Sequence, residues 1–200
     1  RYGQSNYVSG SYGNAIQFDG SGDYLQSSYD DISTTPWRFD ELTVSSWVNF
    51  DSFPSSSTDY DTVVGMDREG QFRLQVNSSG NPIAYGYFYS PSGEKRAIGD
   101  DALVTGVWYH LAATWSETTD DMNLYVNGTL VKTYSFTETT PYLRTYSNYM
   151  YIGRDYNGHY MDGKVDNVQI WQEDFSASNI KAIYEHPING PVLHSTEYYG

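Results

Sequence analysis

The stretch VWYHLAATW-SETTDD-MNLYVNGTLVKTY, residues 107–134, is the clearest structural signal in the chain. Its first part is rich in aromatic and β-favouring residues, which is typical of a half-buried strand. Apolar and polar residues alternate over 122–126, as in a second strand, and a third follows directly. Asn127 and Gly128 join these two strands, and this dipeptide favours a tight hairpin because both residues tolerate positive φ. We therefore predict three consecutive antiparallel strands.

Working outward from this stretch, the same alternation recurs along the chain. Further strands are predicted at 14–18, 24–27, 42–50, 62–66, 71–76, 83–89, 95–98, 149–153 and 164–171. One segment, 176–184, has helical spacing, with Ser176 as its expected N-cap. The pattern predicts an all-β fold of two packed antiparallel sheets, a sandwich, with one short C-terminal helix.

Composition limits the possible functions. The 200 residues suit one sandwich domain with a full core, and the absence of cysteine excludes disulfides and thiolate metal sites. The formal net charge of −14 repels phosphate backbones, so nucleic acid is not expected as a partner. No apolar run is long enough for membrane insertion. The chain begins without methionine, and we expect it to be part of a larger multidomain protein or assembly.

Several motifs resemble a known family when they are taken in order. They are AIQFDGSGDYL at 15–25, LTVSSWV at 42–48, WYHLAATW at 108–115, LYVNG at 124–128, YIGR at 151–154 and GKVDNVQIW at 163–171. This set resembles the laminin-G-like jelly roll of the concanavalin A-like lectin/glucanase superfamily. The resemblance implies two curved sheets and an extracellular or cell-surface module with a role in adhesion or recognition.

The resemblance divides the chain into three parts. Residues 1–14 are predicted to be a linker or an added edge strand. The jelly-roll domain is expected over 15–186. Residues 187–200 then form a tail or linker.

A calcium site is predicted near the chain's terminal strands, which are often neighbours in this superfamily. Asp19 and Asp23 flank an early turn, and Asp166 lies inside an apolar strand. Calcium binds 6–8 oxygens, so carboxylates and glycine-loop carbonyls suit a structural Ca2+. The alternative is that Asp19 and Asp23 are ordinary turn residues and that Asp166 accepts backbone N–H groups.

A ligand site is predicted on loops at one rim of the sandwich. Aromatic rings stack on the apolar faces of sugars, while polar side chains bind sugar hydroxyls. The predicted ligand-binding residues are Asp67, Arg68, Tyr87, Tyr156, His159 and Tyr160. The alternative for the tyrosines is cross-strand pairing on a solvated sheet.

The scattered glutamates argue against an enzyme. The glucanases of the superfamily carry an E-x-D-x-x-E pattern on one strand, and this sequence does not contain it. Glycoside hydrolysis needs two carboxylates at a fixed separation. We therefore predict a non-catalytic module that binds a glycan or a cell-surface protein. The alternative is a structural subunit or repeat of an extracellular filament, surface layer or viral appendage, built through the tyrosine-rich ends.

Overall fold

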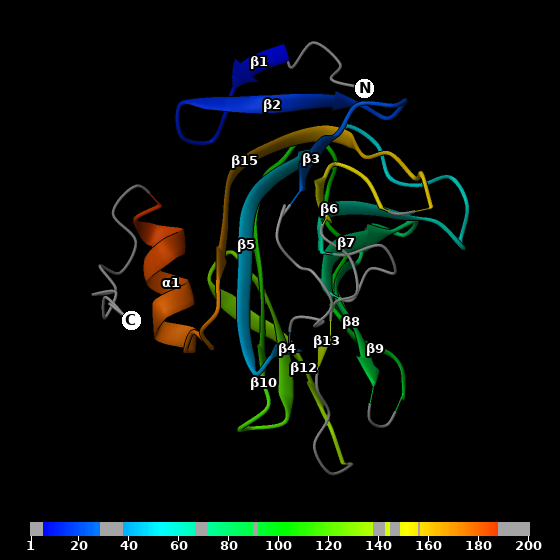
Figure 1. Cartoon of the computed structure of the whole chain (residues 1–200). Helices are drawn as coiled ribbons and strands as arrows, with labels where there is room; N and C mark the ends of the chain where they lie inside the picture. The colour runs from blue at the N-terminus through cyan, green and yellow to red at the C-terminus, as the bar shows by residue number, and fades with distance from the viewer. Residues whose placement is uncertain are drawn as a thin grey trace.

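The fold is defined by a computed structural model. It describes residues 6–28, 38–66, 72–89, 92–137, 143–144, 149–155 and 157–187. Two antiparallel sheets face each other in a jelly-roll sandwich (Figure 1). In spatial order the first sheet comprises β1 (Asn6–Ser9), β2 (Asn14–Asp19), β15 (Asp162–Trp171), β5 (Glu41–Phe50), β10 (Trp108–Ser116), β11 (Asp121–Val126) and β12 (Thr129–Ser135). The predicted fold class is confirmed.

The second sheet carries the candidate site on its outer face. In spatial order it comprises β3 (Leu25–Ser28), β14 (Tyr149–Ile152), β6 (Tyr60–Met66), β7 (Phe72–Asn77), β8 (Pro82–Tyr89), β13 (Leu143–Arg144) and β4 (Arg38–Phe39). An eighth strand, β9 (Ser92–Ile98), also pairs with β8. All the described strand pairs are antiparallel, so each strand places alternate residues in the core and on the outer face.

The core between the sheets is filled by aromatic and branched side chains. Phe88 of the second sheet meets Trp115 of the first at 4.7 Å between ring centroids, and Phe136 packs on both rings at 4.5 and 5.1 Å. All three residues are buried. Edge-to-face contacts of this kind stabilise a core beyond simple area burial. The central strand β10 is therefore fixed firmly against β8.

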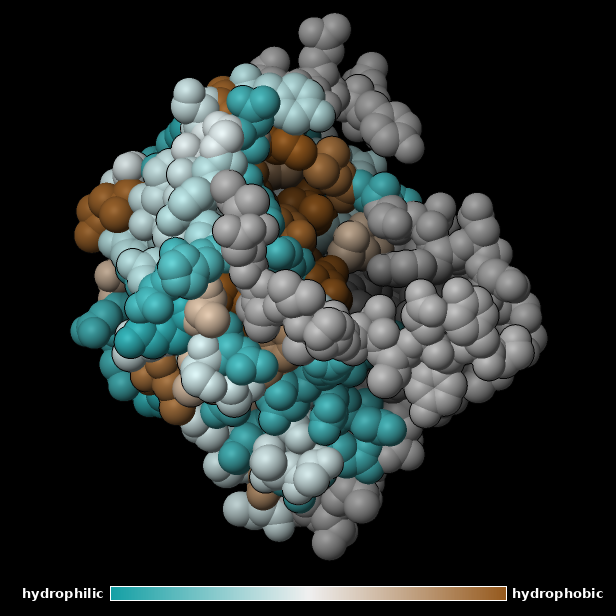
Figure 2. Space-filling view, turned by 90° about the vertical axis from the view of Figure 1, so that its left-hand side faces the viewer, coloured by the Kyte–Doolittle hydropathy of each residue, from teal (hydrophilic) through white to brown (hydrophobic). Residues whose placement is uncertain are grey.

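A third layer covers the outer face of the first sheet. Helix α1 (Ala177–Glu185) begins at the predicted N-cap, where Ser176 Oγ accepts a hydrogen bond from Asn179 N at 3.3 Å. The helix buries Ile180 and Ile183 against the sheet, and it lies on the opposite side from the second sheet (Figure 1). Figure 2 views this face and shows hydrophobic residues near its middle, among hydrophilic ones.

The N-terminal part of the chain adds an edge strand, because β1 pairs with β2. Within the described ranges, α1 falls short of the length and apolarity that crossing a lipid bilayer requires.

Candidate functional site

A polar pocket lies on the outer face of the second sheet, and alternation within β7 explains its floor. Phe72, Leu74 and Val76 enter the core, so Arg73 and Gln75 project to the other side. This pocket, called the sheet pocket, has a volume of about 410 Å3, within the range of small-ligand sites. Its lining is Thr58, Tyr60, Arg73, Gln75, Tyr85, Glu94, Arg96, Asp155, Asn157 and His159.

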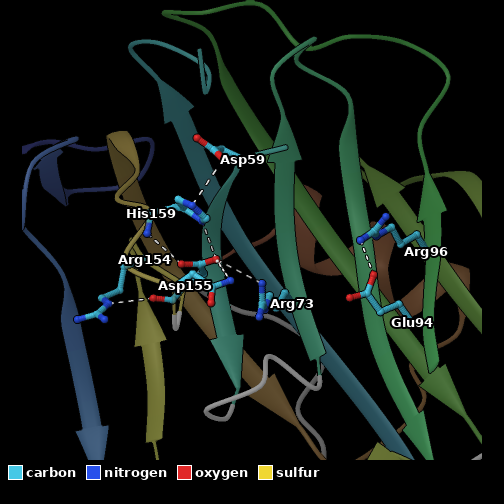
Figure 3. A network of polar contacts seen from close by, with 8 residues as sticks. Asp59, Arg73, Glu94, Arg96, Arg154, Asp155 and His159 are labelled. Carbon is cyan, nitrogen blue, oxygen red and sulfur yellow. Dashed lines mark hydrogen bonds and ion pairs between the residues drawn. The ribbon is translucent and has the colours of Figure 1, made fainter. Parts of the chain in front are cut away.

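A buried ion pair closes one side of the sheet pocket (Figure 3). Arg73 Nη1 lies 3.5 Å from Asp155 Oδ2, and both side chains are at least nine-tenths buried. The same carboxylate contacts His159 Nδ1 at 2.9 Å and accepts the backbone N–H of His159 at 2.9 Å. Breaking a buried pair is costly, so this network fixes the loop that carries His159.

The other side of the sheet pocket combines an arginine with two aromatic rings. The Arg96 guanidinium lies over Tyr60 at 5.3 Å and over Tyr85 at 5.5 Å, which favours cation–π attraction. Arg96 Nη2 also contacts Glu94 Oε2 at 2.6 Å, as Figure 3 shows. Burial, together with the nearby Glu94 carboxylate, raises the pKa of Tyr85. The Tyr85 hydroxyl therefore stays protonated, and the Glu94 carboxylate is its hydrogen-bond acceptor.

Two polar atoms of the sheet pocket are buried without a hydrogen-bond partner among the described residues. They are Gln75 Oε1, on a side chain that is 1% exposed, and Arg96 Nε. A buried polar group that lacks a partner costs about 1–3 kcal/mol. Both atoms belong to side chains that line the pocket, so a polar ligand that reaches them would relieve this cost.

A second pocket, the rim pocket, adjoins the first at the edge between the two sheets. It has a volume of about 430 Å3 and shares His159 with the sheet pocket. Four carboxylates line it, those of Asp19, Asp59, Asp61 and Asp162. Asp19 and Asp162 meet because they are paired across β2 and β15.

The structure places the predicted ligand residues in different surroundings. His159 lines both pockets, and Tyr160 lines the rim pocket while packing on Arg154 at 5.4 Å. Tyr87 lies opposite Glu94 on β9, and it does not line the sheet pocket, where Tyr85 takes that role. The remaining three, Asp67, Arg68 and Tyr156, lie outside the described residues.

The structure does not bring the three predicted metal ligands together. Asp166 is four residues beyond Asp162 along β15, which places it roughly 13 Å from the Asp19 position at about 3.3 Å per residue. Its Oδ2 accepts a hydrogen bond from Tyr12 N at 3.0 Å, as the alternative interpretation required. Asp19 Oδ1 accepts one from Ser21 N at 2.8 Å, within its own turn. Asp23 does not line the rim pocket.

No other metal centre replaces this grouping in the described part of the chain. There, no three His, Asp or Glu side chains are grouped closely enough to hold one ion. The described residues therefore do not fit a preformed calcium site of that kind. Calcium itself stays a prediction.

Most residues of the sheet pocket were missed by sequence reasoning. The alternation of β7 carries a usable signal, since Arg73 and Gln75 interrupt an apolar strand with large polar side chains. Asp155 precedes the predicted ligand residue His159 in the same loop, and the sequence gives no further signal for it. Arg96 and Asp59 have no comparable local signal, because strand pairing and loop position bring them to the site.

The arrangement of two sheets around this site agrees with the family relationship of the sequence. The sequence pattern of the concanavalin A-like lectin/glucanases superfamily matches residues 19–181. The chain belongs to this superfamily. The expected resemblance is thus confirmed over most of its predicted span. No sequence among the curated proteins matches the chain.

Solved structures share the fold of this superfamily member. One of them is domain 4 of an extracellular GH43 arabinanase from Geobacillus stearothermophilus, solved in complex with arabinotriose. Its sequence identity to this chain is 19%, and the TM-score is 0.65. The match covers 90% of this chain and 80% of the arabinanase domain. A native heptameric SAP-like pentraxin from Limulus polyphemus is 19% identical with a TM-score of 0.62, over 85% and 81% of the two chains.

A putative carbohydrate binding protein from Bacteroides ovatus is 22% identical with a TM-score of 0.62. The match covers 84% of this chain and 45% of that one, so the present chain spans less than half its length. At these identities the likeness establishes the fold alone.

Proposed function

We propose that this chain is a non-catalytic extracellular module that binds an oligosaccharide in the sheet pocket. The single observation that carries the proposal is the pair of unpartnered buried atoms, Gln75 Oε1 and Arg96 Nε, in a pocket bordered by tyrosine rings. Sugar hydroxyls both donate and accept hydrogen bonds, so one sugar can satisfy both atoms. Tyr60 and Tyr85 supply the apolar surface on which a sugar ring can lie.

The fixed geometry of the pocket suits recognition. The Arg73–Asp155–His159 network holds one wall, while the two tyrosines hold the Arg96 guanidinium on the other. A site whose side chains are already oriented loses little entropy when the ligand binds. An isolated shallow site of this kind is expected to bind in the micromolar to millimolar range, roughly −8 to −4 kcal/mol.

The similar structures support this proposal at the level of a general function. One is solved with a bound arabinose oligosaccharide as a domain of an extracellular enzyme, and another is a putative carbohydrate binding protein. The first is one domain of a larger enzyme, and the match to the second covers less than half of that chain, which favours a larger setting for this module as well. Several linked copies would raise the overall affinity through effective concentration.

Replacement of Arg96 tests the proposal. Wild-type protein is screened on a glycan array, and the best ligand is titrated by calorimetry. We expect Arg96→Met to weaken binding at least tenfold, about 1.4 kcal/mol, because the donor atoms are lost while the side-chain bulk remains. Lys132→Met is the matched control, since Lys132 contacts Asp100 outside the sheet pocket.

The control should keep wild-type affinity, and both variants should melt near the wild-type temperature. Equal affinities of the wild type and Arg96→Met would contradict binding in the sheet pocket. A screen without any glycan ligand would contradict the proposed function as a whole.

A further inference from the structure

Asp61 is an unbalanced buried charge in the rim pocket. Only 5% of the residue is exposed, and it lines the pocket. Among the described residues, no hydrogen bond or ion pair reaches its carboxylate. A carboxylate with so little exposure and no protein partner is unfavourable, so a proton or a cation beside it in the pocket stabilises it.

The neighbours of Asp61 increase the need for a cation. Burial, and then the negative charges of Asp162 and Asp59, raise the pKa of Asp61 to about 7, while His159 acts in the opposite direction. Asp162 Oδ2 accepts a hydrogen bond from the Ser52 hydroxyl at 2.7 Å, which leaves its other oxygen available. His159 Nε2 lies 3.6 Å from Asp59, so the one basic side chain among the described lining residues already faces a different carboxylate.

The lining favours an ammonium group over a metal ion. Calcium requires 6–8 oxygens at 2.3–2.6 Å, whereas the described acidic side chains do not converge that closely. An ammonium group donates three hydrogen bonds at about 2.7–2.9 Å to oxygens that can be further apart. Phe53 and Tyr160 also line the pocket, and aromatic rings attract organic cations.

The position of the rim pocket indicates what carries the ammonium group. His159 lines both pockets, and Thr58 of the sheet pocket is followed directly by Asp59 of the rim pocket. A ligand in the sheet pocket can therefore extend past His159 towards Asp61. We propose that the rim pocket is a subsite for the protonated amine of an amino sugar, adjoining the sugar unit held in the sheet pocket. This inference rests on the proposed function of the sheet pocket.

A pair of oligosaccharides that differ only in the amine tests the subsite. The probes are a β-1,4-linked glucosamine tetramer and its N-acetylated counterpart, titrated by calorimetry in the presence of a chelator at pH 7.0, where a carboxyl group with a pKa of about 7 is half ionised. We expect the wild type to bind the free-amine tetramer at least tenfold more tightly. Asp61→Asn should remove this preference, because the amide has no charge with which to attract an ammonium group.

Asp101→Asn is the matched control. It removes the same charge from an exposed residue outside both pockets, so it corrects for the general attraction of a cation by a chain of net charge −14. The control should keep the preference for the free amine. Asp61→Asn should fold and melt at or above the wild-type temperature at pH 8, because it removes an unpaired buried charge. A lower melting temperature would show that Asp61 has a structural partner, and it would overturn the subsite.

Two other outcomes would overturn the subsite. The first is equal binding of the two tetramers by the wild type. In that case the proposed function of the sheet pocket still holds if Arg96→Met weakens the binding of an array ligand. The second is that chelator-treated wild-type protein binds Ca2+ tightly from CaCl2, that Asp61→Asn loses this binding, and that the wild type shows no preference for the free amine. That result would assign the pocket to a divalent cation instead.

Discussion

His110 is a buried base whose titration should be measurable in the stability of the fold. The residue is 1% exposed, and its ring packs beside Trp47 and Tyr184 at 5.6 and 6.0 Å between centroids. Neither ring nitrogen has a hydrogen-bond partner among the described residues. Burial lowers the pKa of His110 to about 4. The imidazole therefore behaves as an aromatic packing group at neutral pH.

We predict that this histidine destabilises the protein in acid. The unfolded chain takes up a proton below a pKa of about 6.5, whereas the folded protein does so only near 4, so folding becomes less favourable as pH falls through this window. A shift of two to three pKa units corresponds to a loss on the order of 3 kcal/mol. The measurement is urea unfolding of the wild type and of His110→Phe at pH 7.5 and 4.5.

The difference between the two proteins isolates His110, because Asp61 and the other carboxyl groups titrate in both. The wild type should lose more stability than His110→Phe between the two pH values. Parallel losses would show that His110 is protonated in the folded state or reached by solvent.

At the scale of elements, the β11–β12 hairpin combines local and tertiary requirements. Asn127 has φ of 49° and Gly128 has φ of 74°, as the predicted hairpin turn requires. A Cβ on Gly128 would lie 3.0 Å from the ring of Tyr184 in α1. The turn residue therefore needs to be glycine for its backbone conformation and for its close approach to the helix.

We predict that Gly128→Val lowers the free energy of unfolding by about 2 kcal/mol or more, since a β-branched residue is strained at positive φ. Gly106→Val is the control, because Gly106 has φ of 78° and a Cβ there meets nothing within 4 Å. Chemical denaturation should show the larger loss for Gly128→Val. Equal losses would mean that contact with α1 adds nothing to the cost of the turn.

The strands and the helix could be predicted because each has a local signature. The alternation of β11, the Asn127–Gly128 turn and the Ser176 cap are contained in a few adjacent residues. The pockets have no such signature. Arg73, Arg96 and His159 come together only after three separate segments are placed side by side, and a shift of one residue in strand register would turn the first two away.

The sequence could not place the three predicted metal ligands relative to one another for a related reason. The terminal strands are neighbours, as expected, but the register of β2 and β15 pairs Asp19 with Asp162 and leaves Asp166 beside Tyr12. Both aspartates lie in the same strand, and the sequence does not distinguish which of them faces the turn of Asp19.

At the scale of the whole molecule, the two faces of the sandwich have different roles. Helix α1 covers the outer face of the first sheet, so that face contributes to stability (Figure 1). The outer face of the second sheet keeps the sheet pocket open, bordered by the loop that carries His159. The alternative function, a structural subunit of a filament, surface layer or viral appendage, depends on the tyrosine-rich chain ends. These ends lie largely outside the described residues. The edge strand β1 belongs to the N-terminal end, and its Tyr7 is 72% exposed.

The central claim is that a glycan binds in the sheet pocket, and side-chain NMR tests it most directly. Labelled protein is titrated with the best array ligand while the Arg96 Nε–H and Gln75 amide resonances are followed. Because Arg96 Nε and Gln75 Oε1 have no partner among the described residues, we predict that both resonances shift with one shared binding curve, whereas the His110 ring signals stay unchanged. Saturable binding that leaves the Arg96 and Gln75 signals in place, or that shifts His110 instead, would contradict the account.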